Sequence, residues 1–175
     1  EKGERPEDEQ ETIVKLIAGL DRAASDLATI VEYGRRIELK KQPGFDVQKV
    51  MRTVCSGLDG PGAEIAVDSS SDSVQGSFDP LKLTDAFKWI SGAAIKNRRH
   101  DDEEPRPVSV KIVAVDDREV MIEWSGLRKI DHDPFHSFVG SEEIRLALAA
   151  KIIEAHGGSA KLAEDRLVVQ LPLSE

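Results

Sequence analysis

The chain has 175 residues, enough for one domain of ordinary size with a helical extension. Its 24 Lys and Arg against 33 Asp and Glu give a net charge of −9, which disfavours a nucleic-acid-binding protein. The single Cys55 excludes an intrachain disulfide and a multi-thiolate metal site. No apolar run reaches the roughly 20 residues needed to span a bilayer, and the N-terminus is charged. We therefore expect a soluble, cytoplasmic domain, with no membrane segment, that can be part of a longer protein.

The N-terminal segment predicts a tail and then a long helix. Residues 1–10 contain no apolar side chain and are expected to form a disordered tail. Within residues 11–42 a dimerisation-type helix is expected from Glu11 to about Leu39, because apolar residues recur at steps of four and three. These residues are Ile13, Ile17, Leu20, Ala24, Leu27 and Val31. Such heptad-like spacing favours packing along a partner helix, from a second copy of the chain. The alternative is an amphipathic helix that lies on its own domain.

Residues 43–175 are expected to form the main domain. Gln42-Pro43-Gly44 breaks the first helix, and Phe45–Leu58 predicts a second helix with Asp46 as its N-cap. Short strands are expected at 63–67 and 74–78. The pair Asp79-Pro80 then begins a helix that continues to about Asn97.

The second half of this domain continues the alternation of helices and strand pairs. A charged loop is expected over 100–107, followed by strands at 108–115 and 119–124 and a long loop to Gly140. The complete order predicts an α+β fold: a two-layer α/β sandwich with helices on one face of a mixed, largely antiparallel sheet, preceded by a long helix.

The last segment, 144–173, predicts a buried helix and two strands. The helix is apolar almost all round, which is typical of burial in a packed layer. Ser141 is the expected N-cap, with Glu142 and Glu143 in the first turn. At the other end, Gly157 and Gly158 can adopt the left-handed conformation that ends a helix. His156 is expected at the helix C-terminus, and strands are expected at 159–163 and 166–171.

Several stretches resemble the catalytic ATP-binding domain of bacterial sensor histidine kinases. The run LALAAKIIEAHGG, with strands ending in LPL, is similar to the end of that domain. FDPLKLTDAFKWISGAAIKN is similar to the helix that carries the family's Asn box, and ATIVEYGRRIELKKQPGFDVQKVM to the second helix of its dimerisation hairpin. The resemblance covers most of the chain. It implies a histidine-kinase ATPase-like fold and a role in two-component signalling.

The motifs that bind ATP in this family are altered here. The resemblance places the two asparagines of the Asn box, one of which holds magnesium, at Trp89 and Ala93, and the nearest asparagine is Asn97. Neither of the two replacement side chains can ligate a hard cation. The first glycine box, with its adenine-reading aspartate, falls at Ser125 and Gly126.

The second glycine box is also altered. It retains Gly140, but Glu143 and Arg145 stand in glycine-like positions. Side chains there block the close backbone approach that glycine permits. Glu142 and Glu143 also occupy the positive end of a helix dipole, where they repel a triphosphate. A degenerate nucleotide site is therefore expected.

The loop before the last helix contains a possible metal cluster, Asp131-His132-Asp133 with His136. Pro134 and the loop setting favour a solvated polar segment instead. Phe135, Phe138 and Val139 are expected to anchor this loop, which lies where the family has its ATP lid.

These observations predict a pseudokinase domain that acts as an interaction or scaffold module in two-component-type signalling. We expect no catalytic residue, no metal and no cofactor, a homodimer through the first helix, and a response regulator or another signalling protein as partner. One alternative is a divergent but active kinase domain that works with a phosphoacceptor helix outside this chain. In it, cations would meet the phosphates of ATP bound with Mg²⁺. The candidate cations are Arg98, Arg99, Arg128, Lys129 and Arg145. Another is a histidine-phosphotransfer protein without its first helix, because no histidine precedes His100.

Overall fold

The chain consists of two units, with the boundary between Arg35 and Arg36. Helix α1 (Glu7–Gly34) belongs to the first unit. The computed structural model describes residues 7–58, 65–69, 73–101 and 104–173. The predicted tail is wrong for residues 7–10, which are helical. Residues 1–6 lie outside the described part of the chain. The helix also ends five residues before Leu39, at Gly34, where the missing side chain disfavours helix continuation.

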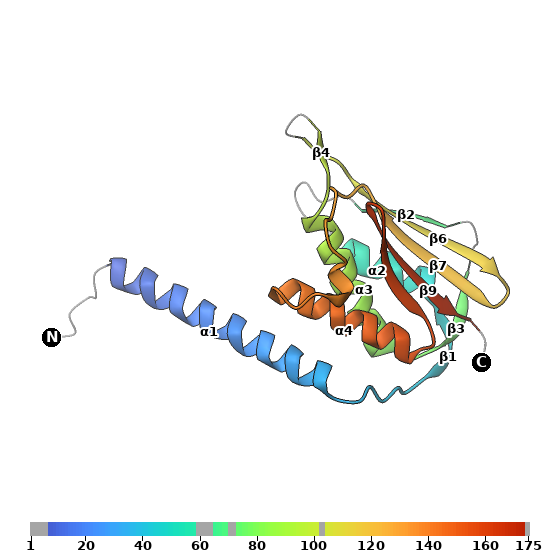
Figure 1. The fold of residues 1–175 in the computed structure, drawn as a ribbon, viewed down its shortest axis with the longest axis horizontal. Helices are drawn as coiled ribbons and strands as arrows, with labels where there is room; N and C mark the ends of the chain where they lie inside the picture. The colour runs from blue at the N-terminus through green and yellow to red at the C-terminus, as the bar shows by residue number, and fades with distance from the viewer. Residues whose placement is uncertain (1–6, 59–64, 70–72, 102–103, 174–175) are drawn as a thin grey trace. The chain divides into compact units, whose positions relative to one another are not determined.

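The second unit is built on a five-stranded sheet with the strand order β2-β6-β7-β9-β8 (Figure 1). Its strands are β2 (Ile65–Ser69), β6 (Val108–Asp116), β7 (Glu119–Ser125), β8 (Ser159–Ala163) and β9 (Arg166–Pro172). β2 pairs with β6 in parallel, and the other neighbours pair antiparallel. The mixed, largely antiparallel sheet is therefore confirmed.

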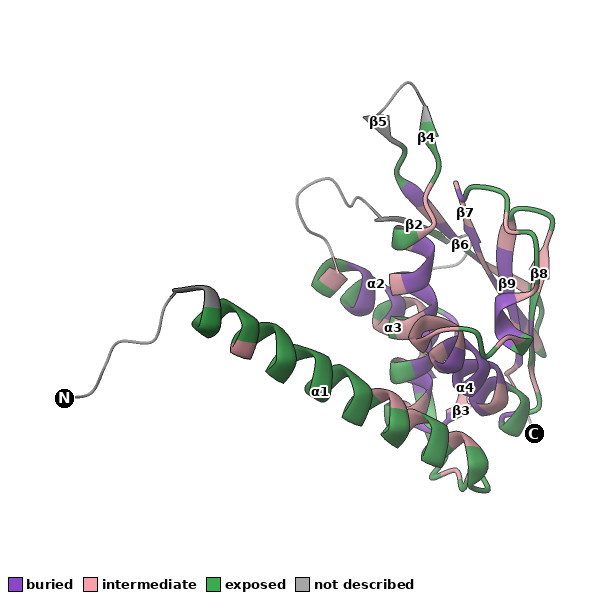
Figure 2. Cartoon of the chain, turned by 60° about the vertical axis from the view of Figure 1, so that its left-hand side comes forward, coloured by how far each residue is buried: buried purple, intermediate pink, exposed green. Residues whose placement is uncertain are grey.

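Three helices cover one face of this sheet: α2 (Val47–Leu58), α3 (Pro80–Lys96) and α4 (Ser141–Ala155) (Figure 1). Figure 2 shows the buried residues of these helices and of the strands gathered between the two layers. α4 is buried almost all round, as its composition predicts. Across the layers, the Trp124 Nε1–H of β7 donates to Ser91 Oγ of α3 at 3.0 Å. The predicted two-layer α+β fold is confirmed.

Several short elements were not expected from the sequence. β1 (Gln42–Asp46) pairs antiparallel with β3 (Gln75–Phe78), where only a helix break was predicted. Gly44, with φ +77°, lies in a bulge of this pairing, so a turn-forming sequence sits inside a strand. A short hairpin, β4 (His100–Asp101) with β5 (Glu104–Pro105), interrupts the predicted loop, and Pro134–His136 forms a 3₁₀ helix.

The cap of α4 corrects one prediction. Gly140, not Ser141, is the N-cap, and Ser141 is the first helical residue. A Cβ on Gly140 would lie 2.7 Å from Glu143 Oε2, so the glycine makes room for a carboxylate that folds back over the helix start.

The end of α4 follows its sequence signal. Gly157 has φ +84°, and the Gly158 N–H donates to the Ile153 carbonyl at 3.0 Å, which closes the last turn. Gly158 is not left-handed; a Cβ there would lie against the Gln170 carbonyl oxygen. None of the helices in the described part of the chain is long and apolar enough to span a membrane.

Candidate functional site

A cavity of about 350 Å³ lies where α3 ends and α4 begins. It is bounded by the last turn of α3, the loop that leads from β7 toward α4, and the first turn of α4. Its lining residues are Ala93, Asn97, Arg128, Lys129, Ile130, Asp131, His132, Pro134, Glu142, Glu143, Leu146 and Leu167. Two of the predicted site positions, Ala93 and Glu143, therefore meet in one cavity.

The wall contributed by α3 has little capacity to hold a metal ion. Ala93 is buried and has no ligating atom. Asn97, the C-cap of α3, donates from Nδ2 to the Ala93 carbonyl at 2.9 Å. Its Oδ1 accepts from Arg128 Nη2 at 3.1 Å and from Arg128 Nε at 3.3 Å. Both ends of the one amide in this wall are therefore engaged within the protein.

The wall contributed by α4 carries two carboxylates at the helix N-terminus. Glu142 Oε1 lies 3.0 Å from Lys96 Nζ, which joins the start of α4 to the end of α3. Glu143 lies beside Glu142 on the cavity lining, with its carboxylate near Gly140. The free N–H groups and positive dipole of a helix N-terminus attract anions. Here the anions nearest to them belong to the chain itself.

A second, smaller cavity of about 110 Å³ lies beside the first on the α3–α4 surface. It takes in Trp89 and Arg145 of the predicted site, together with Ala93, Glu142 and Lys96. Trp89 is half-buried, so it is not a core residue and instead forms an apolar wall of this cavity.

Ser125 and Gly126, the predicted remnant of the first glycine box, line neither cavity. Gly126 has φ +85°, and a Cβ there would lie 2.8 Å from the Pro107 carbonyl oxygen. Its own carbonyl accepts the Arg99 N–H at 2.8 Å. This glycine is therefore required by the local backbone.

The acidic and histidine residues before α4 form a local cap. Asp133 Oδ1 accepts the Phe135 N–H at 3.0 Å, and Asp133 Oδ2 lies 3.1 Å from His136 Nδ1. Phe135 is buried and anchors the loop, as predicted, whereas Phe138 and Val139 are exposed, contrary to prediction. Among the residues that the structure describes, no group of three or more His, Cys, Asp or Glu side chains could hold a metal ion.

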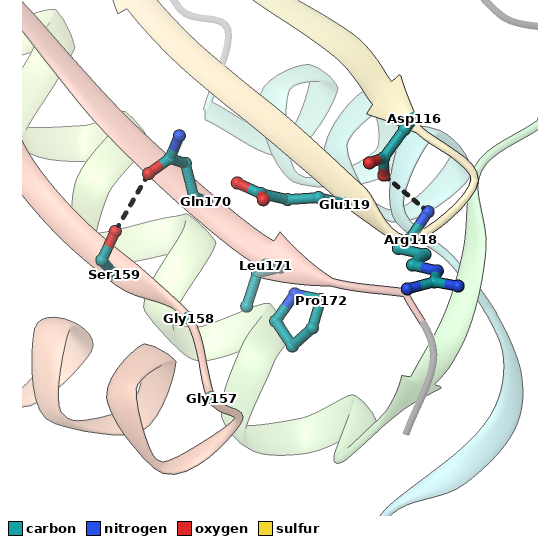
Figure 3. Close-up of a pocket in the computed structure, with 9 residues that line it drawn as sticks. All are labelled: Asp116, Arg118, Glu119, Gly157, Gly158, Ser159, Gln170, Leu171 and Pro172. Atoms are coloured by element: carbon teal, nitrogen blue, oxygen red, sulfur yellow. Dashed lines mark hydrogen bonds between the residues drawn. The ribbon is translucent and has the colours of Figure 1, made fainter.

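Another hollow, of about 510 Å³, lies near the opposite end of α4 (Figure 3). Asp116, Arg118 and Glu119 line it from the β6–β7 hairpin, and Ser159 and Gln170 from β8 and β9. Figure 3 shows Ser159 Oγ bonded to Gln170 Oε1, at 3.3 Å, and the Arg118 N–H bonded to Asp116 Oδ1, at 2.8 Å. None of the predicted site positions lies in this hollow.

The contact between Lys96 and Glu142 is the feature that the sequence interpretation missed. A lysine in the last turn of one helix and a glutamate in the first turn of another are common in any sequence. They signal a contact only once the two helices are known to pack antiparallel.

Comparison of the sequence with protein-family models gave no match, and neither did a search of curated proteins. Solved structures do match. Full-length ShkA in complex with AMPPNP has a TM-score of 0.75 and 19% identity over 97% of this chain, which spans 40% of the length of ShkA. The Acinetobacter baumannii histidine kinase AdeS has a TM-score of 0.67 and 18% identity, over 98% of this chain and 86% of AdeS.

A mycobacterial sensor histidine kinase, MprB, has a TM-score of 0.60 and 18% identity, over 75% of this chain and 97% of MprB. The catalytic domain of the histidine kinase ThkA has a TM-score of 0.58 and 14% identity, over 79% of this chain and 97% of that domain. The resemblance inferred from the sequence is confirmed at the level of fold: this chain has the fold of the catalytic domains of histidine kinases.

Proposed function

We propose that this chain is a histidine-kinase-like domain whose nucleotide site has become degenerate, and that it acts as an interaction or scaffold module in two-component-type signalling. The observation that carries the proposal is the start of α4. Glu142, held by Lys96 at 3.0 Å, and Glu143 stand where a phosphate would have to approach. Carboxylates at that place satisfy the helix dipole and repel a triphosphate.

The opposite wall supports the same proposal. A bound Mg²⁺ prefers oxygen ligands in octahedral geometry. Ala93 offers no side-chain oxygen, and Asn97 Oδ1 is occupied by Arg128. The α3 wall therefore offers no free side-chain oxygen to a magnesium–triphosphate ligand. Among the residues that the structure describes, no group of three or more His, Cys, Asp or Glu side chains could hold the metal ion either.

Helix α1 supports a dimeric module. Its predicted seam residues Leu20 and Leu27 are 70% and 62% exposed, and Ile17 and Val31 are exposed as well. A row of exposed apolar side chains at this spacing is typical of a helix that packs along another helix. A second copy of the chain supplies such a helix, and a response regulator or another signalling protein is the expected further partner.

An active, divergent kinase domain is the second candidate. The cavity measures about 350 Å³, and Arg128 and Lys129 line it as candidate phosphate-binding cations. The ShkA structure, which matches 97% of this chain, was solved with AMPPNP, a nucleotide that ShkA binds. Against this candidate, Arg128 is already paired with Asn97.

Thermal melting with and without AMPPNP and Mg²⁺ distinguishes the two candidates. A ligand at 100 times its Kd stabilises a protein by about 2.7 kcal/mol, which raises Tm by several degrees. We expect no rise for the natural chain. The double variant Glu142→Gln, Glu143→Gln, which removes the two charges and keeps the side-chain size, should show a small rise in Tm. The rise stays small because Asn97 is still bonded to Arg128.

The matched control for this experiment is Glu154→Gln with Glu164→Gln, which removes two exposed charges that do not line the cavity. This variant should behave as the natural chain does. A rise of several degrees in the natural chain would favour the active kinase.

A further inference from the structure

A buried junction joins the start of α3 to the end of α4, at the ends opposite to the cavity. The Asp79 N–H donates to His156 Nε2 at 3.0 Å, and His156 Nδ1 lies 2.8 Å from the Ile152 carbonyl oxygen. A backbone N–H can only donate and a carbonyl can only accept, so the network assigns a neutral imidazole with its proton on Nδ1. Asp79 and His156 are only 5% and 3% exposed.

The Asp79 carboxylate ties a third segment to this junction. Its Oδ1 accepts the Leu81 and Lys82 N–H groups at 3.1 Å, which caps α3. Its Oδ2 accepts the Lys40 N–H at 2.8 Å. Burial raises the pKa of Asp79, but these three N–H bonds outweigh burial and hold the pKa below its ordinary value. Lys40 lies in the short segment that connects α1 to β1.

The same two helices meet again at the cavity. There Lys96, in the last turn of α3, contacts Glu142, in the first turn of α4. A 17-residue helix is about 25 Å long. Packed helices move as rigid bodies rather than bending continuously. A shift of the α3 start against the α4 end therefore alters the opposite ends of the same pair, where the cavity lies.

We propose that Lys40, Asp79 and His156 form a latch through which the segment after α1 sets the relative placement of α3 and α4, and with it the cavity at their far ends. When the Lys40–Asp79 bond is made, the connecting segment, the α3 start and the α4 end are held together. When it opens, the helix pair loses one of its end constraints. The latch does not depend on whether the cavity takes a nucleotide.

Two substitutions break this bond from opposite sides. Lys40→Pro removes the N–H donor and leaves Asp79 unchanged. Asp79→Asn keeps one oxygen to cap α3, since asparagine is as good an N-cap as aspartate, but turns its NH₂ group toward the Lys40 N–H. The matched control is Lys40→Ala, which removes the same exposed side chain and keeps the N–H group.

The measurement is amide hydrogen exchange of the full chain, resolved by residue. Asp79→Asn should speed exchange of the Lys40 amide about tenfold, as expected for loss of one charge-assisted hydrogen bond. Lys40→Pro has no amide at this position, so its effect is measured beside the cavity. Exchange should also quicken at the Arg128 and Ile144 amides, which bond to the Asn97 and Gly140 carbonyls beside the cavity. The two substitutions combined should do no more than either alone.

Three results would overturn the latch. The first is unchanged exchange of the Lys40 amide in Asp79→Asn. The second is unchanged exchange of the Arg128 and Ile144 amides in either variant. The third is an equal rise at Ile122, in the centre of the sheet, since that indicates a general loss of stability. If Asp79→Asn fails to fold, the comparison of Lys40→Pro with Lys40→Ala at the Arg128 and Ile144 amides still tests the latch.

Discussion

Gly126 is the glycine that the sequence resemblance places in the first glycine box, and the local backbone accounts for it. Its φ of +85° lies in the left-handed region, and the Pro107 carbonyl oxygen leaves no room for a side chain. A glycine at this position is therefore explained by the turn that follows β7. Its presence is not a sign of a nucleotide.

Gly126→Ala should lower the free energy of unfolding by about 1–3 kcal/mol, because alanine is strained at this φ and meets the Pro107 carbonyl. Gly92→Ala is the control: nothing lies within 4 Å of its added Cβ in the middle of α3. It should raise stability by about 0.5–1 kcal/mol. Urea unfolding measures both, and equal effects would refute the role given to the Gly126 backbone.

His156 predicts how stability depends on pH. Burial lowers its pKa, although the bond to the Ile152 carbonyl and the charge of Asp79 oppose this; the nearby Lys41 charge lowers it further. The unfolded chain takes up this proton near pH 6.5, and the folded chain only at lower pH. Stability from this group is therefore complete above pH 6.5 and is lost as the pH falls toward the folded pKa.

The urea midpoint should accordingly fall between about pH 7 and pH 5.5. His156→Gln should be less stable at neutral pH and should show a flatter profile in this range. His132→Gln, at an exposed position, should keep the natural profile. Asp79, with its lowered pKa, stabilises the fold above pH 3.8 and loses that effect only in more acidic solution, so the two windows are separate. If the stability of His156→Gln and of the natural chain changed with pH in parallel, His156 would not be the source of the pH dependence.

Helix ends explain how much of the fold could be predicted. Asp79-Pro80 and Gly157 carry local chemistry that marks the start of α3 and the end of α4, and both are found where predicted. Strand β1 was not predicted, because its residues Pro43 and Gly44 usually form turns. Only the long-range pairing with β3 makes that segment a strand.

The candidate site could be predicted from the sequence only in part. Ala93 and Glu143 could be identified because a family pattern gives them positions along the chain. Their proximity in one cavity depends on the antiparallel packing of α3 and α4. The Lys96–Glu142 contact, 3.0 Å long between residues 46 positions apart (142 − 96 = 46), depends on that packing entirely.

Helix α1 predicts dimerisation. Leu20→Glu with Leu27→Glu places two charges on its exposed apolar seam, so the variant should be monomeric in sedimentation equilibrium. Arg22→Glu changes the net charge by the same two units at an exposed position off the seam, and it should leave the mass unchanged. A natural chain that is already monomeric, or a dimer that survives both leucine substitutions, would count against the seam.

For the molecule as a whole, the fold rests on an apolar core, and most of the charged residues around the cavity lie outside it. The core between the sheet and the three helices is formed by apolar side chains such as Trp124, Phe87 and Leu148. The charged residues around the cavity, such as Arg128, Glu142 and Glu143, lie outside this core, whereas Ala93 belongs to both. A chain with Trp89, Ala93, Glu143 and Arg145 at the predicted site positions therefore has the fold of a histidine kinase catalytic domain.

Nucleotide affinity tests the central claim most directly. AMPPNP with Mg²⁺ is titrated calorimetrically into the full chain, with AMPPNP in the absence of magnesium as the control. We predict no saturable binding with a Kd below about 1 mM, because Glu142 and Glu143 hold the helix N-terminus and Asn97 is engaged by Arg128. Magnesium-dependent binding with a micromolar Kd would contradict a degenerate site.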